Sequence, residues 1–352
     1  MKIYDWQIPL WEQLLSEPEK LPHAMLLGGP EGLGKLAFAR ALAARLLCEN
    51  VSGGPSALAC GSCSSCTWLL SGNHPDFRLV QPEDSADASA GEEGAETPSA
   101  NASGPKPGQG SIRINQIRAL EDFVFVGSHR HGKRVALIAP AEQINPAGAN
   151  ALLKILEEPP VSVYFILVTS QQRRLLPTIL SRCRNIVFGR PEPRQAESWL
   201  SAQGVGAGAE LLQLTGGAPL VAADWAEQNR LASYRLVIEA LAENPRDPVA
   251  MAAKWLGLLK SEQGFALPQL VEAIQKWVFD LSMLKIAGRC RYHGAWQTSL
   301  VRLAARASTT GLMACYNDLQ RIRAVARHPL NTQLFLEDMA ARYLRALEIG
   351  KP

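Results

Sequence analysis

The chain has 352 residues, of which 47% are hydrophobic and 20% charged, so it is long enough for two or three domains with apolar cores. Its 36 basic and 33 acidic residues leave a net charge of only +3, which excludes nucleic-acid binding through global charge alone. No apolar run reaches the roughly 18 residues of a membrane span, and the N-terminus lacks a signal-peptide pattern. The sequence therefore predicts a cytoplasmic protein without a membrane segment.

Five short apolar runs alternate with helical patterns over the first 190 residues. The runs are Ala24–Leu27, Phe77–Val80, Val135–Ala139, Val163–Thr169 and Ile186–Phe188. Continuous apolar runs of this length are typical of parallel strands that are buried on both faces. Between the third and fourth runs, Asn145 is a predicted N-cap, Pro146 suits the first helical turn and Pro159 ends the helix. The pattern predicts an α/β domain with a P-loop core.

A phosphate-loop pattern follows the first run. Gly29, Gly32, Gly34 and Lys35 stand between this strand and the next helix. In such loops the backbone N–H groups bind phosphates and the lysine reaches the terminal ones. The next residue is Leu36, where the pattern requires a Ser or Thr hydroxyl that binds magnesium. We therefore interpret the loop as vestigial: hydrolysis of ATP is not expected, and binding without hydrolysis stays open.

Four cysteines follow the phosphate-loop helix. Cys48, Cys60, Cys63 and Cys66 are separated by 11, 2 and 2 residues. Zinc binds four thiolates tetrahedrally, and four protein ligands leave no position for a substrate. The segment is polar and rich in Gly and Ser, unlike the apolar surroundings of most free cysteines. We predict a structural zinc site over residues 48–66; His74 is a further candidate, more simply read as a loop residue.

Residues 82–111 contain no Val, Ile, Leu or aromatic residue. Such a segment cannot bury enough apolar surface to offset the entropy of ordering it. We predict a disordered acidic insert. A partner site in the insert stays open, although a tolerated insertion is the simpler interpretation.

The third apolar run lacks the acidic residues that hold magnesium in P-loop ATPases. Ala139 and Pro140 stand at its end, and Glu142 lies beyond the strand and the proline. With Leu36 in the phosphate loop, both magnesium ligands are missing. Efficient ATP hydrolysis by this chain alone is therefore not predicted.

The pattern is helical from residue 191 to the end. Pro191 and Pro193 mark a linker. Glycine-rich turns delimit a small helical unit over residues 191–230, and amphipathic helices fill residues 231–352. Together with the α/β domain over residues 1–190, this predicts three domains.

Several segments together resemble the clamp-loader branch of the AAA+ proteins. They are Pro22–Ala24, the four-cysteine cluster, NALLKILEEPP at 150–160, TILSRC at 178–183 and NTQLFLED at 331–338. The resemblance spans the chain apart from the acidic insert. It implies an α/β P-loop (AAA+/RecA-like) parallel-sheet domain, a small helical lid domain, and an all-α C-terminal collar domain that joins five subunits in a ring.

The resemblance also implies partners and a site. The partners would be the gamma/tau and delta subunits of DNA polymerase III, in a complex that loads the sliding clamp on primed DNA. In this family the arginine of the motif Ser181-Arg182-Cys183 projects into the ATP site of a neighbouring subunit. A guanidinium suits this role because it is always charged and binds phosphate in a bidentate manner. A second family arginine, which senses ATP in cis, corresponds here to Leu220.

We therefore expect a stationary subunit that does not hydrolyse ATP and in which Arg182 is an arginine finger in trans. It would be a component of the DNA polymerase III holoenzyme without polymerase activity of its own. The alternative that Arg182 only caps its own domain stays open.

Two other functions agree less well with the sequence. A catalytically active, gamma/tau-like ATPase would need unusual magnesium ligation, against which Leu36, Ala139 and Pro140 argue. A zinc-dependent DNA-binding protein would carry basic residues around its cysteines, whereas residues 53–71 contain no Lys or Arg. The basic run at 130–134 is a candidate for direct DNA contact, although such a run before a buried strand is more often a solvated turn.

Overall fold

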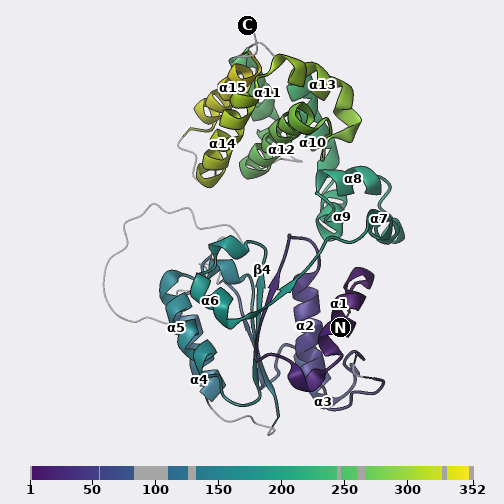
Figure 1. The fold of residues 1–352 in the computed structure, drawn as a ribbon, viewed down its shortest axis with the longest axis vertical. Coiled ribbons are helices and arrows are strands. Elements are labelled where there is room, and N and C mark those ends of the chain that lie inside the picture. Colours follow the sequence, from purple (N-terminus) through teal and green to yellow (C-terminus); the bar gives the residue numbers. More distant parts are fainter. Residues whose placement is uncertain are drawn as a thin grey trace. The chain divides into compact units, whose positions relative to one another are not determined.

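The computed structural model describes residues 2–54, 56–82, 110–125, 132–243, 247–260, 266–326 and 331–348. The chain forms two compact units, Met1–Arg190 and Pro191–Pro352 (Figure 1). Residues 83–109, nearly all of the predicted acidic insert, lie outside the described residues, as do Arg130 and His131 of the basic run.

The first unit is built on a five-stranded parallel sheet. Its strands are β1 (Ala24–Gly28), β2 (Phe77–Val80), β3 (Arg134–Ile138), β4 (Val163–Thr169) and β5 (Arg184–Val187). They are ordered β2-β3-β4-β1-β5, and every neighbouring pair is parallel. Each of the five predicted runs overlaps one strand, so the predicted α/β fold class with a parallel sheet is confirmed.

Helices cover both faces of this sheet. They are α1 (Ile8–Leu15), α2 (Lys35–Leu47), α3 (Ser64–Leu70), α4 (Ile114–Phe125), α5 (Pro146–Glu157) and α6 (Pro177–Arg182). Successive side chains of a strand point to opposite faces: in β1, Leu26 joins the core under α4, α5 and α6, whereas Met25 and Leu27 join the core under α1 and α2. Figure 1 shows α4, α5 and α6 on one side of the sheet and α1, α2 and α3 on the other.

The sheet order determines which strand ends meet. The carboxyl ends of parallel strands lie at one edge of a sheet, where ligands of open α/β folds bind. Because β4 lies between β1 and β3, with Gly28 paired to Thr169 and Leu167 to Ile138, the loops after these three strands emerge side by side. They carry the phosphate loop, Ser170 and Glu142.

Helix α5 has the predicted bounds. The Asn145 side chain accepts a hydrogen bond from the Gly148 N–H at 2.7 Å, and Pro146 is the first helical residue. The helix ends at Glu157, before Glu158 and the two prolines at 159–160. The predicted cap and stop are both confirmed.

The second unit is helical throughout its described residues. Its helices are α7 (Pro193–Ala202), α8 (Gly208–Leu214), α9 (Pro219–Glu227), α10 (Arg230–Ala242), α11 (Pro248–Lys260), α12 (Leu267–Ala287), α13 (Gln297–Arg306), α14 (Thr309–Val325) and α15 (Thr332–Glu348). One apolar cluster extends from α7 to α15 and includes the fully buried Trp255 and Trp277. The further division at residue 230 into lid and collar stays a prediction. In the described part of the chain, no helix combines the length and apolar character that a membrane crossing requires.

Candidate functional site

The phosphate loop keeps the backbone shape that its glycines allow. Gly29, Gly32 and Gly34 have φ angles of 149°, 75° and 81°, which residues with a Cβ rarely adopt. A Cβ on Gly29 would lie 2.6 Å from the carbonyl oxygen of Phe188, and one on Gly34 would lie 2.6 Å from the ring of Tyr4. The loop therefore retains its architecture although its magnesium position is Leu36.

Lys35 turns its amine back into its own loop. Its Nζ donates to the carbonyl oxygens of Gly29 (2.9 Å) and Pro30 (2.5 Å) and to the hydroxyl of Ser170 (3.1 Å). The residue is only 5% exposed. An ammonium group has three protons to donate, so these three acceptors use all of them. A phosphate would have to displace acceptors that belong to the protein.

The N-terminal segment holds the second half of the loop. The indole N–H of Trp6 and the side-chain amide of Gln7 both donate to the carbonyl oxygen of Leu33, at 3.1 and 2.8 Å. The rings of Tyr4 and Trp6 stack with centroids 4.7 Å apart, and the Tyr4 ring faces Gly34. This contact was not predicted, because nothing in the local pattern of residues 4–7 points to a loop almost 30 residues away.

The magnesium positions carry no oxygen ligand from the residues that the family pattern expects. Leu36 is apolar and half-buried, and β3 is followed by Ala139 and Pro140. Glu142, however, lies in a 3-10 turn (Ala141–Gln143) and returns toward the phosphate loop. Its Oε1 accepts from the Ser170 N–H at 3.1 Å, and its Oε2 is buried without a hydrogen-bond partner among the described residues. The position of Glu142 beyond the strand and the proline did not predict this turn. A single carboxylate, however, does not replace both magnesium ligands.

Burial lowers the pKa of Lys35 to about 8, although the carboxylates of Glu31 and Glu142 act in the opposite direction. We expect this pKa to stay near 8 when ATP is added, because the amine keeps its acceptors inside the loop. The measurement is a pH titration of ¹³C-labelled lysine by NMR, with Lys35→Met identifying the signal. A bound phosphate would favour the charged amine and raise its pKa by about one unit or more. Such a rise would mean that the loop still binds nucleotide and that Lys35 exchanges its own acceptors for phosphate oxygens.

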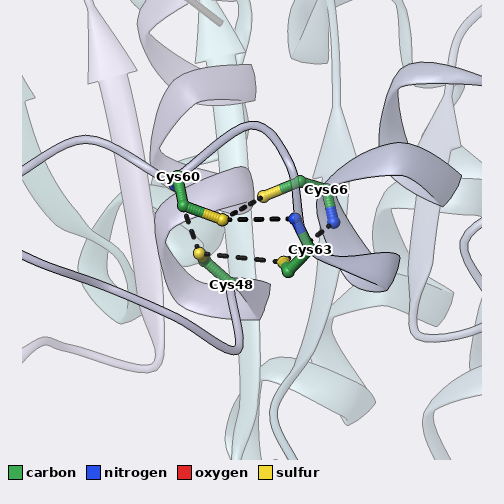
Figure 2. Close-up of side chains that lie close together, drawn as sticks. All are labelled: Cys48, Cys60, Cys63 and Cys66. Carbon is green, nitrogen blue, oxygen red and sulfur yellow. Dashed lines mark hydrogen bonds between the residues drawn. The ribbon is translucent and has the colours of Figure 1, made fainter.

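The four predicted cysteines come together in space (Figure 2). Their Sγ atoms all lie within 4.8 Å of one another; the Cys48–Cys63 distance is 4.0 Å and the Cys60–Cys66 distance 3.9 Å. A tetrahedron of sulfurs with zinc–sulfur bonds of about 2.3 Å has edges of about 3.8 Å. The cluster therefore fits a tetrahedral metal ion.

Local structure explains why these sulfurs converge. Cys48 follows the last residue of α2 and Cys63 is the N-cap of α3, which contains Cys66. Backbone N–H groups of Cys60, Cys63 and Cys66 donate to the sulfurs of Cys48, Cys60 and Cys63, respectively, at 3.3 to 3.4 Å. Hydrogen bonds from the N–H groups of Ser62 and Cys63 lower the pKa of Cys60 to about 6. Donors of this kind stabilise thiolates, the form that binds metals.

His74 is not a member of the metal-binding group. Its Nε2 lies 2.7 Å from the hydroxyl of Ser65, and its Nδ1 accepts from the Asp76 N–H at 3.0 Å. Both ring nitrogens are engaged, so His74 supports the turn before β2, as the simpler interpretation expected.

The motif Ser181-Arg182-Cys183 lies at the end of α6. The Arg182 side chain is half-buried, with 33% of it exposed. Its Nη2 contacts Glu157 Oε1 at 2.5 Å, and its Nη1 donates to the carbonyl oxygen of Thr178 at 3.1 Å and to Ser181 Oγ at 3.3 Å. Cys183 is buried in the core under α6, and burial raises the pKa of its thiol to about 11. The arginine of the motif is thus partly exposed, and its cysteine is buried in the core.

Leu220, which the resemblance places at the position of the family's second arginine, stands in the first turn of α9. It offers no charge to a phosphate. The contact between Arg182 and Glu157 was not predicted either, because the two residues belong to different helices and no sequence pattern links them.

Comparisons with known proteins connect these features to one family. A family model described as DNA polymerase III, delta subunit, matches residues 7–192. The delta-prime subunit of DNA polymerase III from Pseudomonas aeruginosa is 35% identical over 79% of this chain and 77% of that protein. The delta-prime subunit of Escherichia coli is 27% identical over 99% of this chain and 98% of that protein. The gamma/tau subunit of Mycobacterium tuberculosis is 32% identical over 66% of this chain but only 32% of that protein. The similarity to delta-prime subunits therefore extends over most of both chains, whereas the gamma/tau match leaves two thirds of that protein unmatched.

Proposed function

Since this chain belongs to the delta-prime family of DNA polymerase III clamp-loader subunits, we propose that it is the non-hydrolysing subunit of its complex and supplies Arg182 to the ATP site of a neighbouring subunit. Its partners are the gamma/tau and delta subunits in a pentameric ring. The complex acts on the sliding clamp and on primed DNA, so this chain contacts both only indirectly.

The contrast between the two phosphate-binding groups of the chain supports this proposal. Lys35 is buried and gives all its protons to acceptors of its own unit, and neither Leu36 nor Ala139 can bind magnesium. The Arg182 side chain is partly exposed, although its guanidinium is hydrogen-bonded to its own unit. The chain thus lacks magnesium ligands at its own phosphate loop and carries an arginine that a neighbouring subunit can approach.

A guanidinium in trans has a definite chemical role. It neutralises charge that develops on the phosphoryl oxygens during transfer, and its planar fork binds two oxygens at once. The buried Cys183 supports this role because it anchors the end of α6, on which Arg182 lies.

We assign a structural role to the four cysteines, with zinc as the ion. The donors are all sulfur and lie within 4.8 Å of one another, and four thiolates are a ligand set that zinc prefers in structural sites. Four protein ligands leave no coordination position for a substrate. The site would tie the end of α2, the helix that starts at the phosphate loop, to α3.

The test is ATP turnover by the reconstituted gamma/tau–delta complex with and without this chain, beside turnover by the chain alone. We expect the chain to stimulate the complex and to show no hydrolysis by itself. The absence of stimulation would contradict a contribution in trans. Magnesium-dependent hydrolysis by the chain alone would instead mean that Glu142 holds magnesium and that the chain is a motor subunit.

A further inference from the structure

Arg182 already has a carboxylate partner inside its own chain. Glu157, the last residue of α5, places Oε1 2.5 Å from Nη2 of Arg182. The other terminal nitrogen, Nη1, donates to the carbonyl oxygen of Thr178 and to Ser181 Oγ. The guanidinium is therefore held between α5 and α6 by one charged and two neutral acceptors.

A nearby cation stabilises the carboxylate of Glu157 because of where this residue lies on its helix. The last turn of a helix exposes unpaired carbonyl groups and carries the negative end of the helix dipole, which disfavours acidic side chains there. Glu158, the next residue, adds a second negative charge at the same end. Arg182 is the cation that Glu157 contacts, so the pairing compensates for an unfavourable location.

The same pairing competes with any phosphate. The edge of the guanidinium that binds Glu157 is not free for phosphate oxygens, because each N–H group points toward one acceptor at a time. The pair is partly exposed, with 33% of the arginine side chain and 49% of the glutamate accessible, so solvent and salt weaken it. A triphosphate carries more charge than one carboxylate and accepts two hydrogen bonds from the fork, and it can therefore displace Glu157.

We propose that Glu157 is a positioning residue that holds Arg182 against its own unit until the neighbouring subunit carries ATP, and that it acts as a competing latch on the arginine. This inference rests on the proposed function of Arg182 in trans. The exchange is a change of hydrogen-bond partner: Arg182 leaves the carboxylate of Glu157 and binds phosphate oxygens of the neighbour's nucleotide.

The test is the steady-state kinetics of ATP hydrolysis by the reconstituted complex that contains Glu157→Gln. In this variant the binding of ATP no longer has to break the ion pair. The free energies of the ATP-bound state and of the transition state therefore fall by the same amount relative to the free complex. We therefore expect the KM for ATP to fall by about two- to fivefold, which is the range that partly exposed ion pairs permit, while kcat changes by less than about twofold. A merely structural role would lower kcat or raise KM.

A matched control and a double variant make the test specific. Glu158→Gln removes the same charge one residue away, from a side chain that Arg182 does not contact in the described structure, and should leave both constants unchanged. In the Arg182→Ala background, Glu157→Gln should have no further effect.

The outcomes separate the two ideas. Suppose that Arg182→Ala lowers turnover. The latch is then overturned, and the proposed function stands, if Glu157→Gln leaves the KM for ATP unchanged or raises it. The same conclusion follows if Glu157→Gln has the same effect with and without Arg182. If Arg182→Ala leaves turnover unchanged, both are overturned.

Discussion

In a complex that contains Arg182→Ala, hydrolysis at the ATP site bordering this chain should fall by about 10³-fold or more, the range known for arginine fingers. In the proposed role the guanidinium would supply a fixed positive charge at the oxygens where negative charge develops, and alanine would leave that charge uncompensated. Turnover by the whole complex falls by the share that this site contributes. The measurement is single-turnover hydrolysis together with the rate of clamp loading.

Two further variants distinguish the arginine from a general loss of charge. Arg182→Lys keeps the charge but not the planar fork, so it should restore only part of the rate. Arg184→Ala removes an exposed arginine two residues away on β5 and should leave the rate unchanged. Because the Arg182–Glu157 pair is partly exposed, Arg182→Ala should change the free energy of unfolding by less than about 1 kcal/mol. Wild-type turnover by a folded Arg182→Ala complex would refute the finger and leave Arg182 with its capping role.

The second large effect is expected from the cysteine cluster. Wild-type protein should carry stoichiometric zinc, and Cys63→Ser should carry none, because the remaining three thiolates no longer close the tetrahedron. Loss of the ion releases the tie between the end of α2 and α3. We expect the free energy of unfolding of the first unit to fall by about 3 kcal/mol, which corresponds to roughly 6–12 °C in Tm. Metal analysis and thermal unfolding measure the two quantities.

The control for this variant is Cys290→Ser, which changes a half-buried cysteine of the second unit. It should retain zinc and leave the unfolding of the first unit unchanged. Zinc binds thiolates and displaces their protons, so the affinity should also fall as the pH is lowered. Equal Tm values for wild-type and Cys63→Ser, with no zinc in either, would refute the metal site.

Several features were determined by the sequence alone because short-range physics is sufficient for them. Apolar runs of three to seven residues overlap all five strands of the sheet. The reason holds best for β1, β3 and β4, which are buried almost throughout, because strands covered on both faces need such continuous apolarity. Asn145 and Pro146 predicted the start of α5, because a side-chain oxygen and a fixed φ angle act within one helical turn. The spacing of Cys60, Cys63 and Cys66 predicted their convergence, since ligands separated by two residues can reach one ion, and Cys48 supplies the fourth thiolate that a structural zinc site requires.

The tertiary structure alone decided which distant groups meet. The strand order places β4 beside β1 and brings the Ser170 hydroxyl to the amine of Lys35, 135 residues away. The 3-10 turn after β3 brings the carboxylate of Glu142 to the N–H of Ser170. The packing of α5 against α6 joins Glu157 to Arg182. Local periodicity reports which face of an element is buried but not against which element it packs, because the order of parallel strands depends on the crossover connections and on the cores they enclose. The partners of Lys35 and Arg182, from which the proposed function and the further inference are argued, were therefore decided by the fold.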